Sequence, residues 1–310
     1  MKIGIDYVVP MVFPEDRKWQ ADLDGARGFR EKAAGEVRYR SWGTEELLIR
    51  CIRKNLPWVR TIHVILARPS QVQPWMEEMV AVAQQHTEQP SVMVVYHKDI
   101  MPKEVLPTFN SRAIEMYLHR IPDLADYFLY GNDDMFPIAP MGVEEFFRPD
   151  ADASGTVATL LPCLHYREKP FNPERAFQVA CMNGLNFVAS HFDKHFDDHW
   201  LRFGHNIVPM VKATCELFWQ RWPKQMQASV TRFRLPQNFN QYIYSWHQIL
   251  SGQYIDHRPP RQYLSVDADV NDIIQAIRTA NGLLCINDNT SVNDITNLAA
   301  TIRSEIQKRL

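Results

Sequence analysis

The sequence is poor in cysteine and contains no CxxC pair. Its 310 residues include five cysteines, an odd number, at the widely spaced positions 51, 163, 181, 215 and 285. A disulfide framework or a structural zinc site would show closer and paired spacing, so neither is expected. The thiols are therefore predicted to be free, as in a reducing compartment.

Long apolar runs are also missing. No apolar stretch reaches the roughly 18 residues that a membrane-spanning helix needs. The N-terminal segment meets Asp6 early and lacks a small-residue cleavage site, so an ordinary signal peptide is not expected. We expect a cytoplasmic protein. Peripheral contact with the inner face of the membrane, or with a polysaccharide-assembly complex, stays open.

The chain has little excess charge of either sign. Its formal net charge is -2, which excludes a nucleic-acid binder that works by bulk charge, although a local basic pocket remains open. Hydrophobic residues make up 45% and charged residues 23%, a globular composition with enough apolar material for a core. The length fits one large or two ordinary domains.

What the sequence does contain is a series of short apolar runs. These runs predict buried strands at Ile3–Val12, Thr61–Ala67, Ser91–Tyr96, Tyr127–Gly131 and Leu283–Ile286. Helical patterns lie between the first four, at Thr44–Asn55, Val72–His86 and Asn110–His119, with Thr108 or Asn110 as the cap of the last. The alternation predicts an α/β fold with a mostly parallel sheet covered on both faces.

The pattern changes near Gly142 and becomes rich in aromatic residues and histidine. Three helices are predicted there, at Phe192–Phe203, Val208–Trp222 and Asn240–Ser251. A last helix is expected from about Val292 onward.

These patterns divide the chain into three expected parts. Residues 1–141 form an α/β core, and residues 142–260 form a helical insertion. Residues 261–310 supply a strand and a helix that complete the core, with the strand rejoining the sheet.

Two adjacent carboxylates, Asp133 and Asp134, follow the apolar run that ends at Gly131. In open parallel sheets, ligands lie beyond the carboxyl ends of the strands. Mg²⁺ typically takes one or two protein carboxylates together with phosphate oxygens and water. The pattern therefore indicates a divalent-metal site next to Asn132. A turn or helix cap built from Asn and Asp is the alternative.

A second acidic motif, Asn287-Asp288, follows the apolar run at Leu283–Ile286. Alone it indicates a turn more strongly than a site. Two such motifs at the exits of core strands suggest that both converge on one metal.

The histidines fall into two groups. His191, His195 and His199 recur every four residues and would share one helix face. They lack the intervening glutamate of a metalloprotease helix, so a structural or surface role is favoured. His205 stands apart in a predicted loop before a helix, where a histidine can act as a general base near neutral pH. A loop histidine with satisfied hydrogen bonds is the alternative.

Arginines alternate with aromatic residues in two short segments, RYRSWG at 38–43 and TRFRLP at 231–236. Arginine suits bidentate recognition of phosphate, which makes Arg40, Arg232 and Arg234 candidates for that role. A surface strand with salt-bridged arginines is the alternative. Glu115 and His119, four residues apart, fit a hydrogen bond within one helix.

Together these segments resemble a known family. The block LPTFNSRAIEMYLHRIPDLADYFLYGNDDMF, preceded by RYRSWGTEELLIRCIRKNLPWVRTIHVI and VVYHKDIMP, closely resembles the second conserved region of the Stealth family. That family comprises bacterial capsular polysaccharide phosphotransferases and the catalytic part of the lysosomal-enzyme N-acetylglucosamine-1-phosphotransferase. The segments from FGHNIVPMVK to TRFRLPQNFNQYIYSWHQILSG and LLCINDN resemble its third and fourth regions.

The family's first region is less well matched. Its pattern has Trp-Val-Asp-Gly-x-Asp-x-x-Trp after an Ile-Asp pair, and this chain keeps Asp6, Val12, Asp16 and Trp19. Met11, Phe13 and Pro14 stand in place of the family's Trp, Asp and Gly. This departure bears on how the nucleotide end of the donor is held.

The resemblance implies a Rossmann-like core and transfer of a sugar-1-phosphate from a nucleotide-diphosphate sugar, with a UDP-sugar as the expected donor. The acceptor would be a hydroxyl of a sugar or polysaccharide, and the product a phosphodiester in capsule or exopolysaccharide synthesis. Mg²⁺ or Mn²⁺ would bind the diphosphate. The implied metal ligands are Asp133, Asp134 and Asp288. The implied catalytic residues are His205 as base, Arg234 at the phosphoryl group, and Asp134. The implied donor-binding residues are Asp6, Asp16, Arg40, Asn110, Asn132, Arg232 and Asn287.

Two other functions compete with this interpretation. An ordinary glycosyltransferase would use the same donor and release a nucleoside diphosphate. A non-catalytic scaffold for polysaccharide assembly would bind neither donor nor metal, and the altered first region favours it. A metal-dependent phosphatase is a more distant alternative.

Overall fold

The computed structural model describes residues 3–27, 39–83, 90–150, 159–288 and 295–310. Its main sheet has five strands in the order β10-β4-β1-β2-β3. The strands are β1 (Ile5–Pro10), β2 (Thr61–Leu66), β3 (Ser91–Tyr96), β4 (Tyr127–Tyr130) and β10 (Val208–Val211). β1 to β4 are parallel and β10 runs antiparallel to β4, so the predicted α/β fold with a mostly parallel sheet is confirmed.

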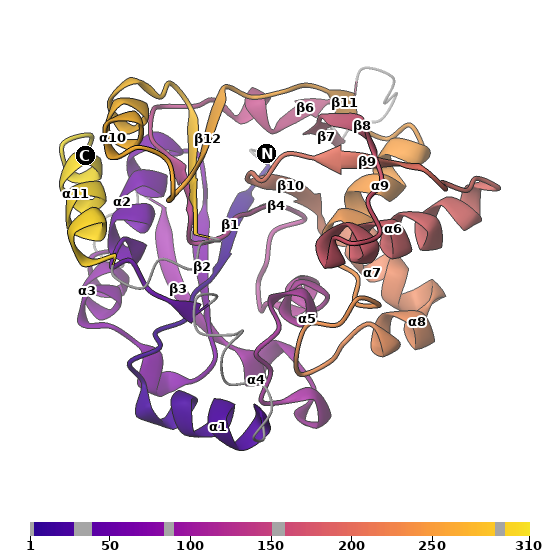
Figure 1. Ribbon diagram of the computed structural model, residues 1–310, viewed down its shortest axis with the longest axis horizontal. Coiled ribbons are helices and arrows are strands. Elements are labelled where there is room, and N and C mark those ends of the chain that lie inside the picture. The colour runs from indigo at the N-terminus through magenta and orange to yellow at the C-terminus, as the bar shows by residue number, and fades with distance from the viewer. Residues whose placement is uncertain (1–2, 28–38, 84–89, 151–158, 289–294) are drawn as a thin grey trace.

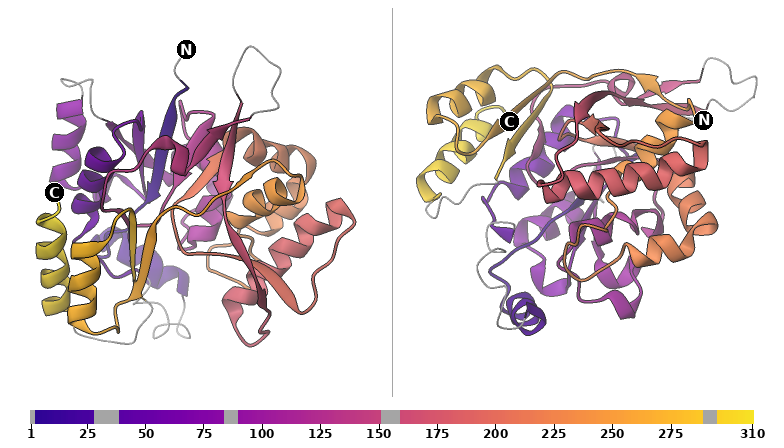
Figure 2. Two further views of the ribbon diagram at one scale, coloured as in Figure 1. Left: turned by 90° about the horizontal axis from the view of Figure 1, so that it is seen from above. Right: turned by 45° about the vertical axis from the view of Figure 1, so that its right-hand side comes forward.

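Alternating side chains of β1 enter two different cores. Tyr7 and Val9 join one apolar cluster with Leu48 of α2, whereas Val8 joins a second cluster with Trp246 of α9. Because successive strand residues point to opposite faces, the sheet is buried on both sides. Figures 1 and 2 show the sheet between two helical layers, with α2, α3, α10 and α11 on one side and α5 to α9 on the other.

The helices of the first half connect the parallel strands. They are α1 (Arg17–Arg27), α2 (Glu45–Asn55), α3 (Pro74–Ala83), α4 (His97–Ile100) and α5 (Ser111–Glu115). The predicted helix at 110–119 is shorter than expected. Asn110 caps α5 by accepting a hydrogen bond from the Arg112 amide, and a separate 3-10 turn, η5 (Leu118–Arg120), follows.

The segment 142–260 is not purely helical, and the prediction of a helical insertion is wrong in this respect. It contains α6 (Ala176–Ala189), α7 (Lys212–Arg221), α8 (Pro223–Ala228) and α9 (Tyr242–Leu250). It also contains β10 and five further strands, β6 (Phe147–Pro149), β7 (Leu160–Leu164), β8 (Tyr166–Pro170), β9 (His199–Phe203) and β11 (Ile255–Asp256). β6, β7 and β11 form one small sheet, and β8 and β9 form a ribbon.

The predicted helix at 192–203 is wrong. The chain leaves the preceding 3-10 turn at Asp193, whose φ of 52° lies in the left-handed region that ends regular helices. His199 then begins β9, so the three spaced histidines do not share a helix face. His191 packs on Trp222 with ring centroids 3.9 Å apart, and His195 pairs with Asp197.

The predicted helix at 208–222 is half right. Residues 208–211 form β10, because they are buried and pair with β4 at the edge of the main sheet. Only from Lys212 does the chain become helical. The helix predicted at 240–251 is confirmed as α9.

The C-terminal strand does not rejoin the main sheet. β13 (Leu283–Asn287) lies between β12 (Arg261–Ser265) and β5 (Met135–Pro137) in a separate three-stranded sheet. α10 (Val270–Thr279) and α11 (Thr296–Gln307) pack beside it against the α2 side of the core. The predicted start of the last helix near residue 292 lies outside the described residues.

Candidate active site

A pocket of about 340 Å³ lies at the carboxyl ends of the parallel strands. Residues at the ends of all four strands contribute to its wall: Met11 directly after β1, Ala67 directly after β2, His97 directly after β3 and Asn132 two positions after β4. This is where open α/β sheets bind ligands, because strand ends and loops leave a crevice there.

The turn after β4 brings Asp133 and Asp134 into the pocket. Gly131 is required at its start, because a Cβ there would collide with the hydroxyl of Tyr7. Burial, and then the charge of Asp134, raise the pKa of Asp133 to about 7. The turn that the sequence allowed is therefore present, and both of its carboxylates line the pocket.

Asp134 contacts three other polar side chains of the site. Its Oδ2 lies 3.0 Å from His205 Nε2 and accepts a hydrogen bond of 3.1 Å from Asn287 Nδ2. The Cys285 thiol donates to the same oxygen at 3.5 Å. The other oxygen, Oδ1, is buried and has no hydrogen-bond partner among the described residues.

The two Asn-Asp motifs lie side by side, and their predicted convergence on one metal stays a prediction. β13 pairs with β5 so that Cys285 lies opposite Met135, and the Ile286 amide donates to the Asp134 carbonyl at 3.2 Å. This register places Asn287 beside Asp134.

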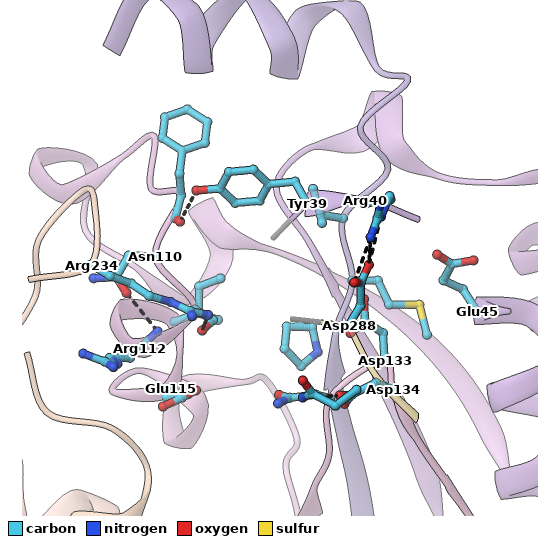
Figure 3. A pocket seen from close by; sticks show the side chains of 18 of the residues that line it. Tyr39, Arg40, Glu45, Asn110, Arg112, Glu115, Asp133, Asp134, Arg234 and Asp288 are labelled. Atoms are coloured by element: carbon cyan, nitrogen blue, oxygen red, sulfur yellow. Dashed lines mark hydrogen bonds and ion pairs between the residues drawn. The ribbon is translucent and has the colours of Figure 1, made fainter. Parts of the chain in front are cut away.

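Asp288 occupies the same pocket but is already engaged. Arg40 donates to it from Nε at 2.8 Å and from Nη2 at 2.6 Å, and the indole of Trp42 donates at 3.0 Å. Glu45 lies nearby, and burial raises its pKa. Figure 3 shows Asp288, Asp133, Asp134 and Glu45 along one side of the pocket.

His205 reaches the pocket from the loop before β10. Burial lowers the pKa of His205, but the charge and hydrogen bond of Asp134 outweigh this, and its pKa is raised. The described residues Asp134, His205 and Cys285 place one possible ligand atom each within 4.8 Å of one another.

The opposite wall carries positive charge. Arg234 donates to the Ser111 hydroxyl at 2.6 Å, and Arg112 donates to the Leu235 carbonyl at 3.3 Å. Figure 3 shows both arginines across the pocket from the three aspartates, with Glu115 below them. Burial raises the pKa of Glu115, which accepts hydrogen bonds from the Gln241 amide and the Tyr130 hydroxyl.

Asn110 acts as a tether for the loop that carries Arg234. Its Nδ2 donates to the Thr231 carbonyl at 3.0 Å and to Asn238 Oδ1 at 3.0 Å, while its Oδ1 caps α5. Asn132 lines the pocket and accepts a hydrogen bond from the Tyr130 hydroxyl at 3.0 Å.

Three of the expected donor-binding residues do not line this pocket. Asp6 is fully buried in an ion-pair network with Arg60 and His63. Asp16 accepts hydrogen bonds from the Lys18 amide and the Ser70 hydroxyl at the start of α1. Arg232 donates to the Pro107 carbonyl on the exposed side of its loop. The structure corrects their assignment, because their polar atoms are used in structural contacts.

Comparisons with known proteins show what this chain is similar to. Residues 38–154 match the description "Stealth protein CR2, conserved region 2". The receptor polysaccharide phosphotransferase WefC of Streptococcus gordonii is 29% identical over 328 residues, covering 94% of this chain and 92% of that protein. The chain therefore carries a match to the second conserved region of the Stealth family and is similar over most of its length to a polysaccharide phosphotransferase.

The chain is also similar to other proteins. The capsular polysaccharide phosphotransferase WcwK of Streptococcus pneumoniae is 27% identical over 332 residues, covering 94% of this chain and 92% of that protein. The apo structure of WbbM, a bifunctional glycosyltransferase, has a TM-score of 0.43 at 10% identity. It covers 100% of this chain, which spans about half (52%) of the WbbM chain. Among the described residues, no helix has the length and apolarity to cross a membrane.

Two of the residues that depart from the first Stealth region lie in different parts of the structure. Phe13, which replaces an expected aspartate, is 7% exposed and packs in the apolar core, and it does not line the pocket. Met11, which replaces an expected tryptophan, does line it. The two changes therefore affect different places, the core and the pocket wall.

The structure also adds pocket residues that the sequence did not single out. Arg112 lies in α5, two positions after Asn110, and no local pattern marked it as a pocket residue. Glu45 was not singled out because acidic residues are common in the first turn of a helix, where it lies. The aromatic wall formed by Trp19, Tyr39 and Phe109 assembles from distant segments, and no local pattern predicts it.

Proposed function

We propose that this chain transfers a sugar-1-phosphate from a nucleotide-diphosphate sugar, with a UDP-sugar as the expected donor, to a hydroxyl of a sugar or polysaccharide acceptor. The product is a phosphodiester in capsule or exopolysaccharide synthesis. Two curated relatives with nearly full coverage are named polysaccharide phosphotransferases, which supports this reaction type. The observation that carries the proposal is one pocket with a histidine–aspartate pair on one side and two arginines on the other.

The pocket suggests an orientation for the donor. Trp19, Tyr39 and Phe109 pack edge to face, with ring centroids 5.1 Å and 5.6 Å from Trp19. Aromatic side chains offer apolar faces for a nucleoside base. We place the nucleoside at this wall and the diphosphate between the aspartates and the arginines.

The residues present fit a divalent cation. Asp133 and Asp134 are adjacent carboxylates, and burial followed by the charge of Asp134 raises the pKa of Asp133. One buried oxygen of Asp134 has no hydrogen-bond partner among the described residues. Such uncompensated oxygen donors suit Mg²⁺ or Mn²⁺. We therefore assign the cation to these two residues. The carboxylate of Asp288 is engaged by Arg40, and it would join them only by releasing that partner.

A cation there would neutralise diphosphate oxygens and, by its charge, favour the unprotonated form of His205. His205 then accepts the proton of the acceptor hydroxyl as that oxygen attacks the phosphorus next to the sugar. Arg234 and Arg112 stabilise the negative charge on the transferred phosphoryl group. The bond between the two donor phosphates breaks, and the nucleoside monophosphate leaves.

Two substitutions test these roles. Asp134→Asn keeps the size of the side chain but removes its charge, and His205→Ala removes the base. Each is expected to lower transfer at least about 100-fold, the usual contribution of a general base, with the melting temperature nearly unchanged. The release of nucleoside monophosphate is the readout. Full activity in a folded variant would refute the role of the residue concerned.

A further inference from the structure

A group of arginines lies outside the pocket and is not used by the proposed reaction. We call it the arginine cluster, and its members are Arg167, Arg202, Arg258 and Arg261. Arg167 of β8 and Arg202 of β9 are direct partners in the antiparallel register, so both side chains project from the same face of the ribbon. Like charges placed opposite each other destabilise a strand pair, which makes a stabilising anion the natural complement.

The side chain of Arg261 extends from β12 over the backbone of Gly204 and so joins the cluster. A Cβ at position 204 would collide with the Arg261 guanidinium, so the glycine leaves room for it. Burial and the charge of Arg258 lower the pKa of Arg261, and the charges of the two arginines on β8 and β9 act in the same direction. Among the residues that the structure describes, no carboxylate pairs with any member of the cluster.

The nearby acids are occupied elsewhere. Asp256 pairs with His165 at 2.9 Å, and Glu145 pairs with His257 at 2.7 Å. These two acids therefore do not pair with the arginines of the cluster.

The cluster borders a shallow hollow of about 40 Å³, whose wall includes Gly204, Arg258 and Arg261. The hollow is much smaller than the main pocket, so it suits a small group such as a phosphate rather than a sugar ring. Arginine side chains suit such a group because their guanidinium groups can bind phosphate oxygens in pairs.

The hollow and the active site are direct neighbours. Gly204 lines the hollow and His205 lines the main pocket, and successive Cα atoms lie about 3.8 Å apart. Tyr263, two residues after Arg261 on β12, faces His205 edge-on with ring centroids 6.4 Å apart. A phosphate held in the hollow would place an attached sugar beside the proposed base.

We propose that the arginine cluster is an acceptor subsite that binds a phosphodiester group of an anionic glycan. This inference rests on the proposed function, whose product carries such a group and could serve as the next acceptor. The concave, phosphate-sized hollow beside His205 favours a glycan over a membrane surface, which would meet a flat array of charges.

The test measures binding and needs no turnover. The probes are a chemically prepared, phosphodiester-linked hexose oligosaccharide and a neutral oligosaccharide of equal length, titrated calorimetrically into wild-type protein. The double variant Arg202→Gln/Arg258→Gln changes two exposed side chains. It is expected to raise the dissociation constant of the charged oligosaccharide about tenfold or more, since charge-assisted hydrogen bonds are lost. Added salt is expected to weaken wild-type binding.

Controls separate this proposal from the proposed function. Arg221→Gln removes an exposed arginine on α7, away from the cluster, and is expected to bind like wild type. His205→Ala is expected to bind the oligosaccharide although it cannot transfer. Equal binding by wild type and the double variant, or no preference for the charged probe, would overturn the subsite. Arginine-dependent binding to phosphatidylglycerol vesicles without arginine-dependent oligosaccharide binding would also overturn it, in favour of membrane contact.

Discussion

The role of Asp6 yields a sharp prediction, because the family resemblance and the structure assign it differently. Its carboxylate is fully buried. It accepts hydrogen bonds of 2.8 and 2.7 Å from Arg60 and of 2.8 Å from the Ala125 amide, and it lies 3.0 Å from His63. These contacts tie β1 to β2 and to the loop before β4. We therefore expect Asp6 to stabilise the fold without touching the donor.

The Asp6→Asn variant measures this contribution. It keeps the shape of the side chain but removes the charge, and its amide donors would face donors of Arg60 or Ala125. The Arg60 side chain is half exposed, so its charge is not left buried, and the cost comes from weakened charge-assisted hydrogen bonds, about 1.5–3 kcal/mol. For 310 residues, an unfolding entropy of about 2.1 cal/mol/K per residue converts this to a fall of about 2–5 °C in melting temperature.

Urea denaturation and calorimetry measure the loss, and the KM for the donor is measured on the folded variant. The matched control is Asp126→Asn, an exposed carboxylate near the same loop, which is expected to change stability by under about 0.5 kcal/mol. A loss below about 1 kcal/mol, or a raised donor KM in a variant of wild-type stability, would refute the structural assignment of Asp6.

Three further predictions concern Asp6, Gly131 and Asn287. First, burial raises the pKa of Asp6, but hydrogen bonds from His63 and Arg60 lower it by more. The pKa of Asp6 in the folded protein is therefore lowered. Its stabilisation is fully present above the unfolded pKa of about 3.9 and is lost as pH falls through the folded value, so urea midpoints of wild type and Asp6→Asn should converge in acid. Second, Gly131→Ala should cost about 1–3 kcal/mol, because the new methyl group meets Tyr7; an unchanged melting temperature would contradict this. Third, Asn287→Ala should lower kcat/KM about tenfold at nearly constant stability, because Asp134 loses a positioning hydrogen bond; wild-type kinetics would exclude that role.

The parallel part of the sheet was predictable from local sequence. The buried runs that became β2 and β3 are continuous and apolar, and helical patterns separate them, so each strand was found at nearly its full length. β10 was missed because its short segment, VPMV, carries no alternation, and only pairing with β4 settles its conformation. β9 was missed because the histidine spacing imitates a helical period, whereas its pairing with β8 is a long-range contact.

The candidate site was predictable where its residues follow strands. Asp134 and Asn287 each come directly after or at the end of an apolar run, and β5–β13 pairing brings them together. The pairing of Asp288 with Arg40 was not predictable, because the two residues are far apart in the chain and either could have faced a ligand. The structural role of Asp6 was not predictable for the same reason. Its partner His63 lies in β2, and its partner Arg60 lies in the loop before β2.

The central claim is that attack falls on phosphorus, and the fate of the donor phosphates tests it directly. Purified protein is incubated with a UDP-hexose and Mg²⁺, with and without a sugar acceptor, and the products are followed by ³¹P NMR. The proposed function predicts UMP together with a sugar phosphodiester, or UMP with hexose-1-phosphate when water is the only acceptor. UDP together with a free or transferred sugar carrying no phosphorus would contradict it.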